Sequence, residues 1–418
     1  MNVLIKSATI IDSKSEYHNT VQDILIENGV ISRISKRINN PDDYKVIRRD
    51  GLHVSEGWFD SGVSFGEPGF EERETIKNGL KTAGLSGFTS VILNTNTQPV
   101  LDTSADIAYV ISKAHNHAVK LIPMGALTQE SKGDTLAELF DMTNAGACAF
   151  YDFKQSIGNA NMLKIALQYV NSFDGLVCSY PQDDAITGQG VVNEHIMSTS
   201  LGLKGNPNLS EALQVSRDLM LLEYTSGKLH IPTISTKDAV DLIRKAKQKK
   251  QNVTCSVAIH NLFFTDAVLK NFNSNFKVQP PIRTQSDTEA LIAGLKDGTI
   301  DMVTSDHNPL NPELKNVEFD HASYGTIGLE SAFGALSTLF SMKKTIQILT
   351  CGKSRFGIDE SGIAEGKKAD LTLFNPSIKY VFKDEHILSK SKNSLFLNTQ
   401  LKGQVYGIIA NNKILLKS

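Results

Sequence analysis

The chain has 418 residues, with 43 Lys and Arg against 45 Asp and Glu, which gives a net charge of −2. Such a balance provides no broad positive field and excludes nucleic acid as an expected partner. With 40% apolar and 21% charged residues, the chain is not expected to be disordered. Its length suits one large domain of about 250 residues plus a smaller one.

No apolar run approaches the ~18 residues of a membrane-spanning helix. The N-terminus passes from MNVLIKSATI into DSKSEYHN without the small-residue cleavage site of a secretory signal peptide. The four cysteines lie far apart, with no zinc-type spacing. We therefore expect a cytoplasmic protein with reduced thiols and no membrane partner.

Both ends of the chain have β patterns. The first ~50 residues alternate apolar and polar positions around Asn28-Gly29, the dipeptide that a type I′ hairpin turn prefers. The last ~50 residues repeat this pattern around Asn411-Asn412. Neither end can bury a sheet face alone, so we predict one small β-sandwich-like domain from residues 1–55 plus 355–418.

Short β-rich runs alternate with amphipathic helical patterns in the middle of the chain. Such alternation is typical of repeated β-α units. The eight β runs lie near 57–65, 88–94, 120–126, 147–153, 176–180, 229–235, 253–259 and 301–306. Eight repeats predict an α/β fold with a closed (β/α)8 TIM barrel over residues 56–354.

Active sites of such barrels lie at the carboxyl ends of the strands. The segment FDSGVSFGEPGF, which closes the first run, resembles the Asp-x-His-x-His-x-Arg-x-Pro-Gly motif of dihydroorotases in the amidohydrolase superfamily. Later segments agree in order: HIPTISTKDAV, VTCSVAIHNLFFTD, VQPPIRT, TSDHNP and EGKKADLTLFNP. The resemblance covers essentially the whole chain and implies a metal-dependent hydrolase of a cyclic amide in pyrimidine biosynthesis.

The four histidines that bind metal in this family are replaced. Gly62 and Ser64 stand at the two strand-one positions, which face the barrel interior because side chains alternate along a strand. Ser179 stands at the strand-five position and Thr233 at the strand-six position. The resemblance therefore implies a site without its imidazole ligands.

Two acidic positions remain. Asp306 matches the strand-eight aspartate that contacts the metal and exchanges protons in active relatives. Asp152, flanked by Tyr151 and Lys154, falls within about a residue of the strand-four position that bridges the metals. These carboxylates are either a residual metal pair or inherited polar residues bound to loop amides. The second alternative is favoured, because two carboxylates leave most positions around a transition metal unfilled.

The substrate-binding residues implied by the resemblance are also altered. Gly66 replaces the arginine that holds the substrate carboxylate, and Leu310 replaces a histidine after strand eight. Losing the guanidinium removes a charge-assisted hold on a carboxylate. The remaining candidates for substrate binding are Asn96, His260, Asn261, Gln279, Arg283 and His307. Arg283 is either a ligand group or a residue that fixes its loop, and neither histidine replaces a lost metal ligand.

Three functions follow from these residues. The leading hypothesis is a catalytically silent family member with no cofactor and a structural or regulatory role, because inactive homologues of this family assemble with aspartate carbamoyltransferase. The first alternative is an active dihydroorotase that uses zinc on a reduced ligand set. The second is a small-molecule binding module that reuses the barrel mouth. A homodimer is expected in each case, since two-fold symmetry is the commonest assembly.

Overall fold

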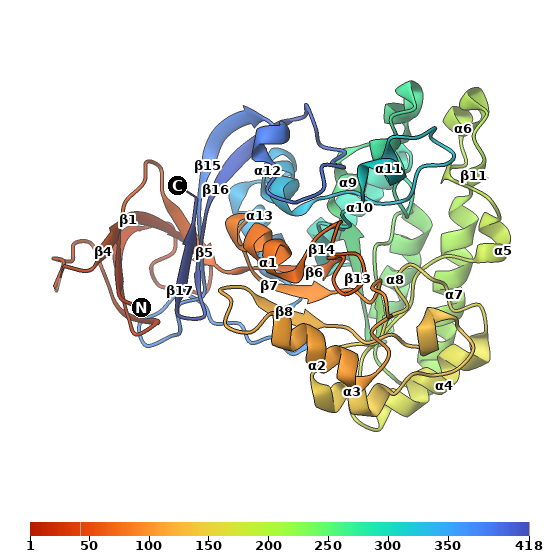
Figure 1. Ribbon diagram of the computed structural model, residues 1–418, viewed down its shortest axis with the longest axis horizontal. Coiled ribbons are helices and arrows are strands. Elements are labelled where there is room, and N and C mark those ends of the chain that lie inside the picture. Colours follow the sequence, from red (N-terminus) through yellow and green to blue (C-terminus); the bar gives the residue numbers. More distant parts are fainter. Residues whose placement is uncertain (42, 418) are drawn as a thin grey trace.

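The computed structural model describes residues 1–41 and 43–417. Both chain ends join one eight-stranded sheet at one side of the molecule, and a β/α barrel forms the rest (Figure 1). The strands of this sheet are β1 (Val3–Ile11), β2 (Val21–Glu27), β3 (Val30–Ser35), β4 (Lys45–Ile47), β5 (His53–Glu56), β15 (Leu371–Val381), β16 (Gln400–Ala410) and β17 (Lys413–Leu416).

The sheet joins the two ends through β5 and β15. β1 pairs in parallel with β5, which pairs antiparallel with β15, so the strands of the two chain ends form two blocks that meet in one hydrogen-bonded order. Both predicted hairpin turns are present. Asn28 and Gly29 have φ of 52° and 78° between β2 and β3, and Asn411 and Asn412 have φ of 48° and 57° between β16 and β17. These left-handed values are those of a type I′ turn.

The barrel strands begin directly after this sheet. They are β6 (Trp58–Val63), β7 (Phe88–Leu93), β8 (Lys120–Pro123), β9 (Val177–Cys178), β12 (Leu229–Ile231), β13 (Val253–Ala258) and β14 (Met302–Thr304). The paired strands β6-β7-β8 and β9-β12-β13-β14 are parallel throughout.

The run predicted near 147–153 contributes only bridges at Phe150, to Gly125 on one side and Val177 on the other. These bridges join the two groups of strands. A bridge between Val63 and His307 closes the barrel, because it joins the end of β6 to the residues after β14. The barrel expected from the sequence is therefore present, with a very short fourth strand.

Helices surround the barrel (Figure 1). They are α1 (Ile76–Leu85), α2 (Ser104–Lys113), α3 (Leu139–Ala145), α4 (Ala160–Asn171), α5 (Asp184–Thr187), α6 (Ile196–Leu201), α7 (Asn208–Thr225), α8 (Lys237–Gln248), α9 (Ile259–Phe263), α10 (Gln285–Asp297), α11 (Pro312–Lys315), α12 (Leu329–Leu339) and α13 (Met342–Thr350). A small pair, β10 (Val192–Asn193) and β11 (Gly205–Asn206), precedes α7. In the described residues no helix combines the length and apolar character needed to cross a bilayer.

Trp58 joins the barrel to the terminal sheet. This fully buried ring lies 4.6 Å from Phe333 of α12 and 5.5 Å from Phe374 of β15, measured between ring centroids. Its indole Nε1 donates to Ser55 Oγ at 2.9 Å, so the polar atom is also satisfied. The contact holds the first barrel strand in a fixed place relative to the sheet.

Trp58→Ala is expected to destabilise the fold by about 3–5 kcal/mol, because a large buried ring is replaced by a cavity. Urea unfolding followed by circular dichroism measures the loss. Tyr109→Ala is the matched control, since this ring on α2 is 39% exposed and its removal opens no core cavity. Equal unfolding midpoints for both variants would show that the Trp58 contact does not support the junction.

Candidate active site

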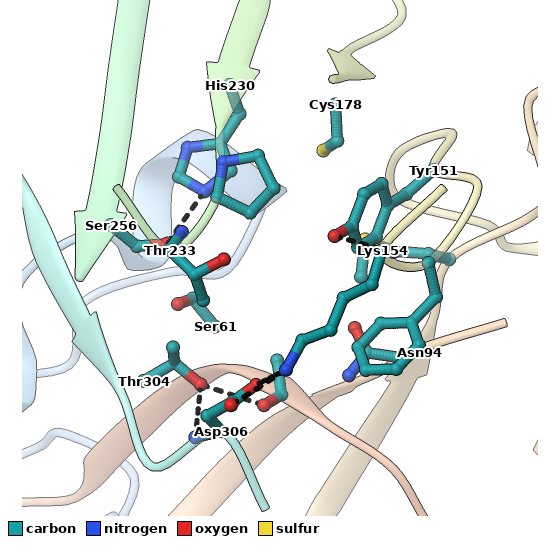
Figure 2. Close-up of a pocket in the computed structure, with 14 residues that line it drawn as sticks. Ser61, Asn94, Tyr151, Lys154, Cys178, His230, Thr233, Ser256, Thr304 and Asp306 are labelled. Atoms are coloured by element: carbon teal, nitrogen blue, oxygen red, sulfur yellow. Dashed lines mark hydrogen bonds and ion pairs between the residues drawn. The ribbon is translucent and has the colours of Figure 1, made fainter. Parts of the chain in front are cut away.

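A small cavity lies at the carboxyl ends of the barrel strands, where the sequence places the active site. Figure 2 shows its lining, with Asn94 from the β7 end, Lys154 from the turn after the fourth strand, His230 from β12 and Asp306 from the β14 end. Its free volume is about 20 Å³. That is room for about one water molecule. The mouth has therefore little space for a ring-sized ligand in this conformation.

A buried ion pair occupies the centre of the site. Lys154 Nζ lies 2.8 Å from both Asp306 oxygens, and the two side chains are 8% and 4% exposed (Figure 2). Burial raises the pKa of the Asp306 carboxyl, and the Lys154 ammonium offsets part of that rise. The ammonium thus stands beside the carboxylate for which the resemblance predicts a contact with metal. In the sequence Lys154 is recognisable only as a neighbour of Asp152.

The strand-one serine is bound to asparagines. Ser64 Oγ donates to Asn96 Oδ1 at 2.7 Å and accepts from Asn94 Nδ2 at 3.1 Å. Asn96 in turn donates weakly to Asn308, at 3.4 Å. Asn96 therefore lies beside the strand-one serine, and its carbonyl oxygen is engaged within the protein.

The other replaced positions are filled in different ways. Ser179 Oγ donates to the buried carboxylate of Asp218 on α7, at 2.6 Å. The Thr233 amide donates to Ser256 Oγ, whereas Thr233 Oγ1 has no partner among the described residues. A Cβ at Gly62 would meet Asn94 at an ordinary 3.4 Å, so this position is open.

Asp152 and Asp306 have separate partners. Asp152 Oδ1 accepts from the amides of Leu127 and Thr128, and its Oδ2 accepts from Thr128 Oγ1 at 2.5 Å. Burial raises the pKa of the Asp152 carboxyl, and these donors oppose the rise. The loop after β8 thus provides hydrogen-bond donors to both oxygens of the Asp152 carboxylate. This is the arrangement of a polar residue bound to loop amides, the second alternative given above.

Asp60 on β6 is a buried carboxylate that the sequence analysis did not single out. It accepts from the Gly62 and Ser305 amides and from Thr304 Oγ1, and so ties β6 to β14. Burial raises its pKa to about 6. In the sequence, Asp60 is marked only as the aspartate that begins the segment resembling the dihydroorotase motif.

Gly66 leaves no room for the arginine of the family. A Cβ at this position would lie 1.9 Å from the Phe70 carbonyl oxygen, which is a backbone atom and cannot move aside cheaply. The Gly66 amide donates to Glu74 O and its carbonyl accepts from the Phe70 amide. The turn over 66–74 therefore occupies the arginine's place. Leu310, at the other altered position, is buried.

Arg283 is held inside the protein. Its guanidinium, 2% exposed, donates to Ser235 Oγ, Asn193 Oδ1 and Asn206 O. Glu211 of α7 lies at 4.0 Å and accepts from the backbone and hydroxyls of residues 235 and 236. This geometry favours the loop-fixing alternative. Gln279 Nε2 donates to Gln182 Oε1 over a long 3.5 Å.

His260, Asn261 and His307 are fully buried near the mouth. Each of these residues has buried polar atoms without a hydrogen-bond partner among the described residues. These atoms are both ring nitrogens of His260, Asn261 Oδ1 and His307 Nε2. Burial, with a smaller contribution from the Lys154 ammonium, lowers the pKa of His260 to about 3. Burial also lowers the pKa of His307 to about 4. Both imidazoles are therefore neutral at physiological pH.

The donor set does not fit a zinc site. Throughout residues 1–41 and 43–417, no group of three or more His, Cys, Asp or Glu side chains is placed to hold a metal ion. Asp306 is paired with an ammonium, and Asp152 is saturated by amides and a hydroxyl. Catalytic zinc needs three protein ligands that leave one position open.

Comparisons with known proteins agree with the fold. A family model described as dihydro-orotase-like matches residues 54–239, and one described as the amidohydrolase family matches residues 208–409. The structure is similar to an L-hydantoinase (dihydropyrimidinase) from Arthrobacter aurescens, with a TM-score of 0.87, 20% identity and coverage of 100% of this chain and 96% of that chain. At this identity the similarity shows the fold alone.

Curated relatives are more similar in sequence. A dihydroorotase from Ruminiclostridium cellulolyticum is 38% identical over 100% of this chain and 99% of its own length. A dihydroorotase from Caldicellulosiruptor saccharolyticus is 39% identical over 99% of this chain and 98% of its own length. Identity at this level over the full length shows that the chain belongs to the dihydroorotase family of the amidohydrolases.

Proposed function

We propose that this chain is a catalytically silent dihydroorotase-family protein with a structural or regulatory role. The ion pair between Lys154 and Asp306 carries the proposal. Hydrolysis of a cyclic amide at neutral pH uses a bound hydroxide, which zinc supplies by lowering the pKa of water from 15.7 to about 7. An ammonium neutralises Asp306 but has no coordination position for water.

Asp306 cannot replace that chemistry alone. A general base contributes about 10²–10⁴-fold and does not polarise the amide carbonyl as a metal does. Both Asp306 oxygens lie at 2.8 Å from the same ammonium, which opposes part of the rise that burial causes in the pKa of this carboxyl. The 66–74 turn, which replaces the substrate arginine, supports the proposal independently.

The names of the relatives favour a second candidate, an active dihydroorotase. The two relatives described above are named dihydroorotase and align over nearly their whole length. This candidate requires Lys154 to leave Asp306, so that the carboxylate becomes free, and further ligands to reach it. Open space at Gly62 is the feature of the site that is compatible with such a change.

A partner role is supported by the resemblance alone. Inactive homologues of the family assemble with aspartate carbamoyltransferase, and this chain retains the complete barrel and terminal sheet. The retained fold provides a surface even where the chemistry is lost. We therefore propose an aspartate carbamoyltransferase as the partner.

Lys154→Met is expected to destabilise the fold by about 3–5 kcal/mol, because the change leaves the buried Asp306 carboxylate without its counterion. Lys154→Met/Asp306→Leu should recover most of the loss, because both charges are then removed. Urea unfolding followed by circular dichroism measures both. Lys132→Met, at an exposed ion pair with Glu130, is the control and should not shift the midpoint. An unaffected Lys154→Met variant would contradict a buried pair.

Elemental analysis is expected to find far less than one zinc per chain, both as purified without chelator and after incubation with zinc followed by desalting. Dihydroorotate should be hydrolysed no faster than in buffer. The positive control for zinc binding alone is Gly62→His/Ser64→His/Ser179→His/Thr233→His combined with Lys154→Ala, which supplies four imidazoles and frees Asp306. Stoichiometric zinc in the natural protein, with turnover abolished by chelator and by Asp306→Ala, would establish the second candidate instead.

The tagged full-length chain, recovered from extract of its native host, is expected to bring down aspartate carbamoyltransferase activity. An unrelated tagged protein at equal expression is the control for carry-over. Recovery of the chain solely with copies of itself would argue against the partner role and would leave the zinc result unaffected.

A further inference from the structure

The chain between β15 and β16 leaves the terminal sheet and crosses to the barrel (Figure 1). Its two ends are fixed by buried apolar side chains, Ile387 on one side and Leu395 with Phe396 on the other. The Phe396 ring packs 5.4 Å from Phe263 of α9, measured between centroids. Residues 388–394 between these ends read LSKSKNS, contain neither helix nor strand, and are called the flap below.

One side of the flap holds the 66–74 turn. The Lys390 amide donates to Glu74 Oε2 at 2.9 Å, and Ser391 Oγ donates to the Arg73 carbonyl at 2.9 Å. Glu74 is fully buried, so its carboxylate needs such donors. The flap therefore fixes the end of the turn that fills the place of the substrate arginine.

The other side of the flap holds the loop after β14. Asn393 Oδ1 accepts from the Leu310 amide and its Nδ2 donates to the Asn308 carbonyl, both at 3.2 Å. The Asn393 carbonyl accepts from the Ile327 amide at 3.1 Å. Asn308 also accepts from Asn96, which follows β7. The flap thus joins the carboxyl ends of the first and last barrel strands.

A third anchor comes from α12. Glu330 Oε1 accepts from the amides of Leu388 and Ser389, at 3.2 and 2.9 Å, and from Ser389 Oγ at 2.6 Å. Leu388 is the one apolar residue of the flap, and it is half-buried. The anchors of the flap to the barrel are therefore hydrogen bonds, each of which adds little net stability. Segments with few buried apolar contacts open locally while the core stays folded.

We propose that the flap is a hinged closure of the barrel mouth. It opens as one unit about its apolar ends, while the barrel strands remain paired. Opening releases the 66–74 turn and the loop after β14 together, and so gives solvent and small molecules access to Asn96 and to Ser64 behind it. The proposal concerns access to the mouth and holds whether or not the site is active.

Hydrogen exchange of the natural full-length protein over a series of urea concentrations below the unfolding transition tests the hinge. Peptides covering the flap, Leu310 and Ile327 should exchange with little dependence on urea, because local opening exposes little surface. Peptides of β13 should show the full dependence of global unfolding. A flap with the same urea dependence as β13 would overturn the proposal.

Asn393→Ala tests whether the flap moves as one unit. Loss of its two side-chain hydrogen bonds should speed exchange at Ser389 and Lys390 about tenfold or more, although the acceptors of these amides are untouched. Exchange in β13 should not change. Asn171→Ala, at an exposed asparagine of α4, is the matched control and should alter neither. An effect confined to Leu310 and Ile327 would overturn the single unit.

A thiol at the mouth tests access. Ser64 is 2% exposed, and Ser64→Cys places a sulfur there at nearly the same volume. Iodoacetamide should alkylate the new thiol at least tenfold faster than Cys255, a core thiol of β13 that only global unfolding exposes. Asn393→Ala should widen this ratio. Equal alkylation rates for the two thiols would overturn the flap as an entrance, and the exchange data on the natural protein do not depend on this variant.

Discussion

The barrel mouth depends on the buried charge pair of Lys154 and Asp306. The strand-eight carboxylate must have a positive partner, because an isolated carboxylate in a nearly dry site is costly. Here the partner is Lys154, held at 2.8 Å on a side chain that reaches in from the fourth strand. A covalently attached cation has a fixed position and cannot be exchanged with solvent. The neighbouring hydroxyls and amides are bound to protein partners: Ser64 to Asn94 and Asn96, and Ser179 to Asp218.

Much of the architecture was predictable from local sequence. The alternation at both ends, the turn at Asn28-Gly29 and the eight β runs each depend on neighbouring residues, so they predict elements without tertiary information. The fourth strand was the exception, since only Phe150 completes bridges there. Its pairing depends on Gly125 and Val177, which are distant in the sequence.

For the site, the sequence predicts only which positions differ from the family motif. The resemblance predicts which ligand positions carry other residues, but the contacts that those residues make are decided by side-chain direction. Lys154 points to Asp306 whereas Asp152 points to the loop after β8, and a register shift of one residue reverses such directions. The obstruction at Gly66 was also hidden, because the Phe70 carbonyl that causes it belongs to a turn formed by backbone hydrogen bonds.

The crowding at Gly66 bears on how this chain can change over evolutionary time. Gly62 has free space beside it, so a single substitution there can be accepted and later reversed. Gly66 is different, because any side chain would collide with a main-chain oxygen until the whole 66–74 turn is rebuilt. An arginine at this position therefore requires the backbone of the turn to be rebuilt together with the side chain. A single substitution at residue 66 cannot supply a guanidinium to the mouth while the turn keeps its present shape.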